Sequence, residues 1–202
     1  MEIIQYRNSI FSSNTYLLYQ KELKGVWLID PGDTNQIIDW IEDNGKIVRG
    51  ILLTHSHFDH IYGVNDLAEK FPEINIYASY HAKEGLYSEK LNGSLYMEIP
   101  FVIKKQDLTI VKESDLIELW KGLFLRVIET PGHGRDCLSF EVEKNLFTGD
   151  ALIPGIKVYT KTKYGDKEVA RNSINRIFDQ FDDLTIIWPG HESSCFLGDL
   201  KS

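Results

Sequence analysis

The chain has 202 residues, of which 43% are hydrophobic and 26% charged, and its formal net charge is −8. This length and composition predict a single domain, residues 1–202, with a well-buried core. The acidic charge disfavours nucleic-acid binding because it repels phosphate backbones. No apolar run is long enough to cross a bilayer and the N-terminus lacks the layout of a secretory signal, so we expect a cytoplasmic protein without membrane association. Two cysteines are too few for a disulfide framework or a cysteine-rich metal site.

Hydrophobic periodicity and turn residues divide the first half of the chain into short strands and helices. Pro31-Gly32 breaks one strand, after which Thr34 can cap a helix that Gly45 stops. Strands are predicted at residues 2–6, 15–19, 26–30, 47–54 and 74–78, and helices at 34–44, 63–70 and 81–91.

The second half repeats this mixture of strands and helices. Strands are predicted at residues 108–111, 116–119, 123–129, 138–143, 145–148 and 185–188, and a helix at 169–181. No Gly/Ser-rich or Pro-rich linker separates the halves. The order of elements predicts an α/β fold in which two sheets pack face to face with helices outside.

Five of the six histidines lie where a predicted strand gives way to a loop. Strand ends in layered α/β folds converge on one edge, where sites are usually built, whereas a core histidine would sit inside an apolar run. These positions therefore favour metal ligands. The five are His55, His57, His60, His133 and His191.

The densest of these signals is the run from His55 to His60, which also contains Asp59. Residues i and i+2 of an extended segment project to the same side, so His55 and His57 can bind one ion together. Asp59 and His60 follow at the turn into the next helix and can reach a neighbouring point. Imidazole nitrogens and carboxylate oxygens are suitable zinc ligands.

Three later residues, His133, Asp150 and His191, each come directly after a glycine. Taken alone, each is also compatible with an ordinary loop or cap residue. The preceding glycine allows close backbone approach and unusual backbone angles, as a crowded metal site requires. We therefore include all three in the candidate ligand set.

Six segments together resemble the metallo-β-lactamase fold superfamily over nearly the whole chain. Residues 54–63, Thr-His-Ser-His-Phe-Asp-His-Ile-Tyr-Gly, are similar to the signature HxHxDHxxG. The others, in order, are residues 14–17 (Asn-Thr-Tyr-Leu), 28–32 (Leu-Ile-Asp-Pro-Gly), 130–133 (Thr-Pro-Gly-His), 147–150 (Phe-Thr-Gly-Asp) and 189–191 (Pro-Gly-His). The resemblance implies a four-layer αββα sandwich of two mixed sheets with the metals at one sheet edge.

The resemblance also implies a division of the ligands between two zinc ions, with iron or manganese as alternatives. His55, His57 and His133 would hold the first ion, Asp59, His60 and His191 the second, and Asp150 would bridge them. Seven ligand residues suit two adjacent ions better than one.

Within the superfamily, the short relatives of hydroxyacylglutathione hydrolases (glyoxalase II) look nearest. The chain departs from them at residues 134–137, Gly-Arg-Asp-Cys, where the family usually has Thr-Pro-Gly-Ser. It also ends soon after His191, without the helical tail that binds glutathione in full-length members. Both departures put a glutathione thioester in doubt as the substrate.

The chemistry expected of such a site is hydrolysis of a small-molecule thioester or related ester by a metal-bridging hydroxide. Asp59 is the expected catalytic residue, because it can accept a hydrogen bond from the hydroxide and orient it. No general acid is evident, which favours a thiolate leaving group over an amine. Candidate substrate contacts are Arg135, Tyr159 and Lys161, which suit an anionic group, although the lysine-rich segment 157–167 is equally typical of a solvated loop.

Three other functions remain open at this point. One is a mononuclear iron persulfide dioxygenase of the same fold that uses His55, His133 and Asp150. Another is a nuclease or phosphodiesterase, which the charge and the chain length disfavour. The last is a non-catalytic member, which the apparently complete ligand set disfavours. The sequence does not define the oligomeric state.

Overall fold

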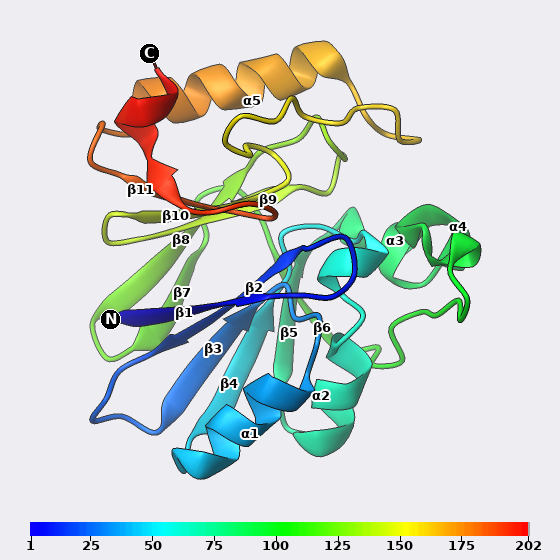
Figure 1. The fold of residues 1–202 in the computed structure, drawn as a ribbon, viewed down its shortest axis with the longest axis vertical. Coiled ribbons are helices and arrows are strands. Elements are labelled where there is room, and N and C mark those ends of the chain that lie inside the picture. The colour runs from blue at the N-terminus through cyan, green and yellow to red at the C-terminus, as the bar shows by residue number, and fades with distance from the viewer. Residues whose placement is uncertain (202) are drawn as a thin grey trace. The chain divides into compact units, whose positions relative to one another are not determined.

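A computed structural model describes residues 1–201 and divides the chain into two compact units. Unit 1 comprises Met1–Ala78 and Ala82–Ile110, and unit 2 comprises Ser79–His81 and the chain from Val111 onward. Each unit is built on its own mixed six-stranded sheet with helices against it (Figure 1). The predicted class, two mixed sheets flanked by helices, is confirmed.

The sheet of unit 1 has the strand order β1-β2-β3-β4-β5-β6. β1, β2 and β3 pair antiparallel, and β3, β4 and β5 pair parallel. The strands are β1 (Glu2–Arg7), β2 (Asn14–Tyr19), β3 (Gly25–Ile29), β4 (Ile47–Leu52), β5 (Asn75–Ser79) and β6 (Leu108–Val111).

Helices α1 (Asn35–Asp43) and α2 (Val64–Lys70) cover one face of this sheet (Figure 1). Their apolar sides join the strands in one buried cluster, in which Ile37 and Ile41 of α1 and Leu67 of α2 are at most 1% exposed. Parallel strands need such crossover helices, and burial on this face explains the apolar run of β4. This core fixes the point at which β4 ends, just before the histidine run.

The sheet of unit 2 has the order β12-β11-β10-β9-β8-β7, in which only β10 and β11 pair parallel. Helix α5 (Lys167–Gln180) lies along one face of it, with Ile177 and the following Phe181 in the core (Figure 1). The strands are β7 (Leu116–Trp120), β8 (Leu123–Glu129), β9 (Leu138–Val142), β10 (Asn145–Gly149), β11 (Ile186–Pro189) and β12 (Cys195–Phe196).

Most predicted bounds differ from the observed ones by one or two residues, and three larger differences have a physical reason. The helix predicted at 81–91 is two short helices, α3 (Ala82–Leu86) and α4 (Glu89–Asn92), because Ser88 caps the second one by accepting a hydrogen bond from the amide of Leu91. Thr34 begins α1 without a side-chain cap, since its hydroxyl bonds to Asp66 instead. The two-residue strand β12 is too short for a periodicity signal.

No helix within residues 1–201 is both long enough and apolar enough to span a membrane.

The turn between β1 and β2 is tied to the start of α1 and to the loop before α2 by Asp33. Its carboxylate accepts hydrogen bonds from the Ser9 amide and hydroxyl, at 2.7 and 2.9 Å, and from the Tyr62 hydroxyl at 2.7 Å. Partial burial alone would raise the pKa of Asp33, but these bonds outweigh it and lower the pKa below its usual range. Burial and the Asp33 carboxylate also raise the pKa of Tyr62 to about 12.

We predict that Asp33→Asn destabilises the protein by about 1 kcal/mol or less near pH 7, because the bonds are charge-assisted but partly exposed. Since the folded-state pKa lies below the unfolded one, this contribution is complete above about pH 4 and is lost as the pH falls through the folded value. Urea unfolding of the wild type and of Asp33→Asn at pH 7 and pH 3 should show a smaller difference in the free energy of unfolding at pH 3. Asp39→Asn, an exposed change on α1, is the matched control. A difference in unfolding free energy that does not change with pH would contradict the role given to the Asp33 carboxylate.

Candidate metal centre

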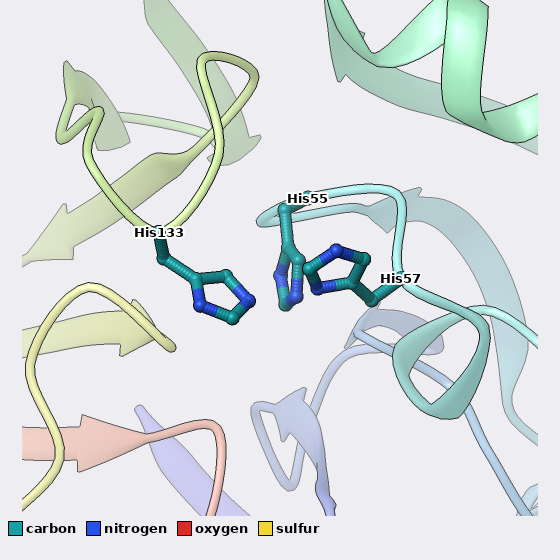
Figure 2. Close-up of side chains that lie close together, drawn as sticks. All are labelled: His55, His57 and His133. Atoms are coloured by element: carbon teal, nitrogen blue, oxygen red, sulfur yellow. The ribbon is translucent and has the colours of Figure 1, made fainter. Parts of the chain in front are cut away.

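The loop after β4 carries the first group of predicted ligands. His55 is three residues beyond the end of β4, and Asp59 and His60 lie in the single turn of 3-10 helix formed by Phe58–His60. His55, Asp59 and His60 are buried and His57 is half-buried. The rings of His55 and His57 meet edge to face with their centroids 4.8 Å apart (Figure 2). The extended spacing of this pair therefore brings both imidazoles together, as predicted.

A buried carboxylate, Asp30, organises this loop from the end of β3. One oxygen of Asp30 accepts from the Thr54 amide at 2.8 Å. Its other oxygen accepts from the Thr54 hydroxyl at 2.5 Å and from Nδ1 of His60 at 3.1 Å. Asp30 is 2% exposed, so its carboxylate loses its contacts with water on folding, and these three hydrogen bonds take their place.

This network fixes which nitrogen of each histidine carries the proton. A carboxylate only accepts, so Nδ1 of His60 donates to Asp30. In the neutral imidazole this leaves the lone pair on Nε2, which lies 3.4 Å from the carboxylate of Asp59. The Thr54 hydroxyl donates its one hydrogen to Asp30, so its oxygen accepts from Nδ1 of His55 at 3.0 Å. Both imidazoles therefore present Nε2 as the metal-binding atom, in the manner typical of metal-ligating histidines.

Asp30 is a functional residue that the sequence patterns do not predict. Its side-chain oxygens lie close enough to ring nitrogens of His55 and His60 for the three to hold an ion, but they already accept three hydrogen bonds. Asp30 is thus a positioning residue, and its backbone adopts a left-handed conformation with φ 49°. The strand-ending Asp30-Pro31-Gly32 was the only signal in the sequence that pointed to it.

Unit 2 brings the other three predicted ligands together around Asp150, which follows β10 directly. One oxygen of Asp150 lies 3.4 Å from Nε2 of His133, and the other lies 3.5 Å from Nε2 of His191. His133 comes from the loop after β8, and His191 follows β11. A carboxylate between two imidazoles, with one oxygen towards each, has the arrangement that a bridging ligand requires.

His133 is oriented by the backbone of the segment that precedes α5. Its Nδ1 donates to the carbonyl oxygen of Tyr159 at 2.7 Å, because a carbonyl can only accept. The Thr162 hydroxyl donates to the carbonyl of His133 at 2.9 Å. As with His55 and His60, the proton on Nδ1 leaves Nε2 as the ligand atom.

The glycines that precede these ligands do not all act alike. Gly132 has φ 138°, and a Cβ there would lie 2.3 Å from the backbone of Ala170. Gly149 also has a positive φ, of 49°, whereas Gly190 does not. The unusual backbone angle predicted for the glycines is therefore found at Gly132 and Gly149, and the prediction is wrong at Gly190.

The predicted substrate contacts occupy three different settings in unit 2. Arg135 stacks its guanidinium over the ring of Tyr164, with its central carbon 3.8 Å from the ring centroid. Tyr159 is 59% exposed, and its carbonyl oxygen accepts a hydrogen bond from His133. Lys161 is exposed to solvent. Their roles in substrate binding stay predictions.

The donor set of the two units fits transition-metal ions of the zinc type. It consists of imidazoles and carboxylates, and the hydrogen bonds of three imidazoles select Nε2 as the ligand atom. It contains no thiolate: Cys137 is buried, and its sulfur accepts from the Gly134 amide at 3.2 Å, as expected of a packing residue.

We predict that Asp30→Asn lowers zinc affinity by about tenfold to a hundredfold. Asparagine keeps the shape and tolerates a left-handed backbone, but its NH₂ group faces the amide of Thr54 or the Nδ1 proton of His60. Competition with a chromophoric chelator measures the affinity, and imidazole ¹⁵N shifts in the metal-free protein report the His60 tautomer. Asp39→Asn serves again as the charge-matched control. Unchanged affinity together with an unchanged tautomer would contradict the role given to Asp30.

Comparison with known proteins places this arrangement in a family. The model of the metallo-beta-lactamase superfamily matches residues 9–191. Hydroxyacylglutathione hydrolase 1 of Vibrio vulnificus (strain YJ016) is 30% identical over 189 residues, which are 94% of this chain and 66% of the relative. The chain spans between 41% and 67% of the length of the curated hydroxyacylglutathione hydrolases that it matches.

Solved structures agree with this placement. The BLEG-1 B3 metallo-beta-lactamase superimposes with a TM-score of 0.90 at 27% identity, covering 98% of this chain and 95% of that one. TTHA1623 in a di-iron-bound form gives a TM-score of 0.83 at 24% identity, covering 96% and 95%, and shows the shared fold alone. The chain belongs to the metallo-beta-lactamase superfamily.

Proposed function

We propose that the chain is a dinuclear zinc hydrolase that cleaves a small-molecule thioester or a related ester. The observation that carries the proposal is the fixed tautomer of His55, His60 and His133, each of which presents Nε2 as a ligand atom. Metal-ligating histidines almost always donate their other ring N–H in this way, which fixes the tautomer and the ring orientation. Relatives named hydroxyacylglutathione hydrolase, which match up to 95% of this chain, support a thioester as the bond that is cleaved.

In this proposal the ligands are divided between the two ions as the family resemblance implies. Figure 2 labels the three histidines that we assign to the first ion. The second ion would be held by Asp59, His60 and His191, and Asp150 would be shared between the two. When bound, the two ions would supply Lewis acidity and lower the pKa of water.

The protein's own residues would orient the reactants. Asp59 is buried beside His60, and the Ser13 hydroxyl donates to its backbone carbonyl at 2.6 Å, which fixes the main chain that carries the carboxylate. There it would act as the catalytic residue by accepting a hydrogen bond from the attacking hydroxide and orienting it. A thiolate leaving group needs no general acid.

The expected partner is a small molecule with a negative charge, rather than nucleic acid or a membrane. Arg135, Tyr159 and Lys161 supply the cationic and polar groups that such a substrate needs, and the overall charge of −8 opposes phosphate backbones. The compartment we expect is the cytoplasm.

The first test is a substrate panel on zinc-loaded protein, covering thioesters, esters, lactones and phosphodiesters, with metal analysis and oxygen uptake on a persulfide. We expect two zinc ions per chain, turnover of a thioester and no oxygen consumption.

His57→Ala should lose about one zinc ion and turnover, whereas Asp59→Asn should lower kcat more than stability. Oxygen consumption on a persulfide by the iron-loaded protein would favour the dioxygenase, and inactivity across the panel would favour a binding protein.

We further predict that Lys161→Ala raises KM for an anionic substrate by about tenfold with little change in kcat, because a lost charge pair weakens ground-state binding. Lys144→Ala, an exposed lysine at the other end of β10, is the control. An unchanged KM would remove Lys161 from the substrate site.

A further inference from the structure

Unit 2 contains a cavity that none of the seven predicted metal ligands lines. It lies between the segment around Val158 and the first two turns of α5, and its volume is about 800 Å³. Small-molecule sites in proteins commonly fall in this size range. The proposed function makes no use of this cavity.

The apolar part of the lining is aliphatic. It comprises Ile156, Val158, Ala170 and Ile174, and no aromatic ring is among the residues that line the cavity. Ile156 is 47% exposed, and Val158 and Ile174 are half-buried, so a ligand here would remove aliphatic surface from water. This lining suits a hydrocarbon chain better than a planar base or ring, which would find nothing to stack on.

The polar part of the lining carries a positive charge that its own acids do not cancel. Asp166 caps α5 by accepting from the amides of Glu168 and Val169, and Glu168 pairs with Arg171 at 3.1 Å. The ammonium groups of Lys157 and Lys167 make no ion pair with any acidic group of residues 1–201. In a chain of net charge −8, two such lysines on one cavity form a local site for an anion.

We propose that this cavity binds a small aliphatic carboxylate. The hydrocarbon chain packs against Ile156, Val158 and Ile174, and the carboxylate lies between Lys157 and Lys167. Charge complementarity selects the headgroup, and the aliphatic lining selects the tail.

The cavity wall is the same segment that orients His133. Val158 and Thr160 line the cavity, while the carbonyl of Tyr159 between them accepts from Nδ1 of His133. The amide of Asp166 donates to the carbonyl of Gly132 at 2.8 Å, which ties the far end of the segment to the loop that carries His133. An occupant of the cavity therefore changes the surroundings of the His133 imidazole without touching it.

Calorimetric titration of the full chain with octanoate tests the proposal, with octan-1-ol and octylammonium as the uncharged and cationic analogues. We expect octanoate to bind at least tenfold more tightly than either analogue. The double variant K157E/K167E should weaken octanoate binding at least tenfold, while K121E/K144E, with the same change in net charge at exposed sites outside the cavity, should change it less than twofold. Val158→Trp, which fills the cavity, should also weaken binding, and circular dichroism checks that each variant folds.

A carboxylate can also bind a metal, so the same titration is made on His57→Ala. Retained binding by that variant places octanoate outside the metal centre and leaves the inference independent of the proposed hydrolysis. In the wild type, octanoate should shift the His133 imidazole signals, and K157E/K167E should abolish that shift at equal octanoate concentration. Equal binding of octan-1-ol, unweakened binding by K157E/K167E, or loss of binding in His57→Ala would each overturn the proposal.

Discussion

The local structure of the histidine loop depends on one buried carboxylate, Asp30, and on the three hydrogen bonds that it accepts. Burying a charge is unfavourable unless it is fully bonded, and here the partners are the backbone and hydroxyl of Thr54 and the imidazole of His60. Through Thr54 the same carboxylate also sets the proton on His55. The end of β3 thus determines the chemistry of the loop after β4, and the parallel pairing of these strands makes that possible.

In unit 2 the imidazole of His133 is oriented by a backbone group rather than by a buried carboxylate such as Asp30. Nδ1 of His133 donates to a backbone carbonyl from the segment before α5, and two further hydrogen bonds join that segment to Gly132 and His133. The positive φ of Gly132 and its contact with Ala170 allow the close approach. Orientation of the ligand therefore depends on the docking of a long loop against α5, which makes this half more responsive to what binds beside that loop.

Much of this was predictable from sequence because it depends on local patterns. Strand ends followed by histidine indicated the candidate ligands, and the spacing of His55 and His57 predicted that their rings lie together. What could not be predicted came from contacts between distant segments: Asp30 and Thr54 are 24 residues apart, and His133 and Tyr159 are 26 apart. The break between α3 and α4 escaped prediction because Ser88 reads as an ordinary helix residue until its hydroxyl is seen to cap the second helix. The role of the Tyr159 carbonyl as the acceptor for His133 carries no signal in the sequence, where Tyr159 is a candidate only as a substrate contact.

The backbone at Asp30 has an evolutionary consequence. Its left-handed conformation is readily adopted by glycine, asparagine and aspartate, and is strained in other residues. Of these three, only aspartate offers two acceptor oxygens and no donor. Two independent constraints therefore disfavour substitution at this position. The left-handed main chain excludes most residue types, and the neighbouring N–H and O–H donors require a side chain that only accepts. A lineage that changed the histidine loop to suit another chemistry would still be expected to keep this one residue.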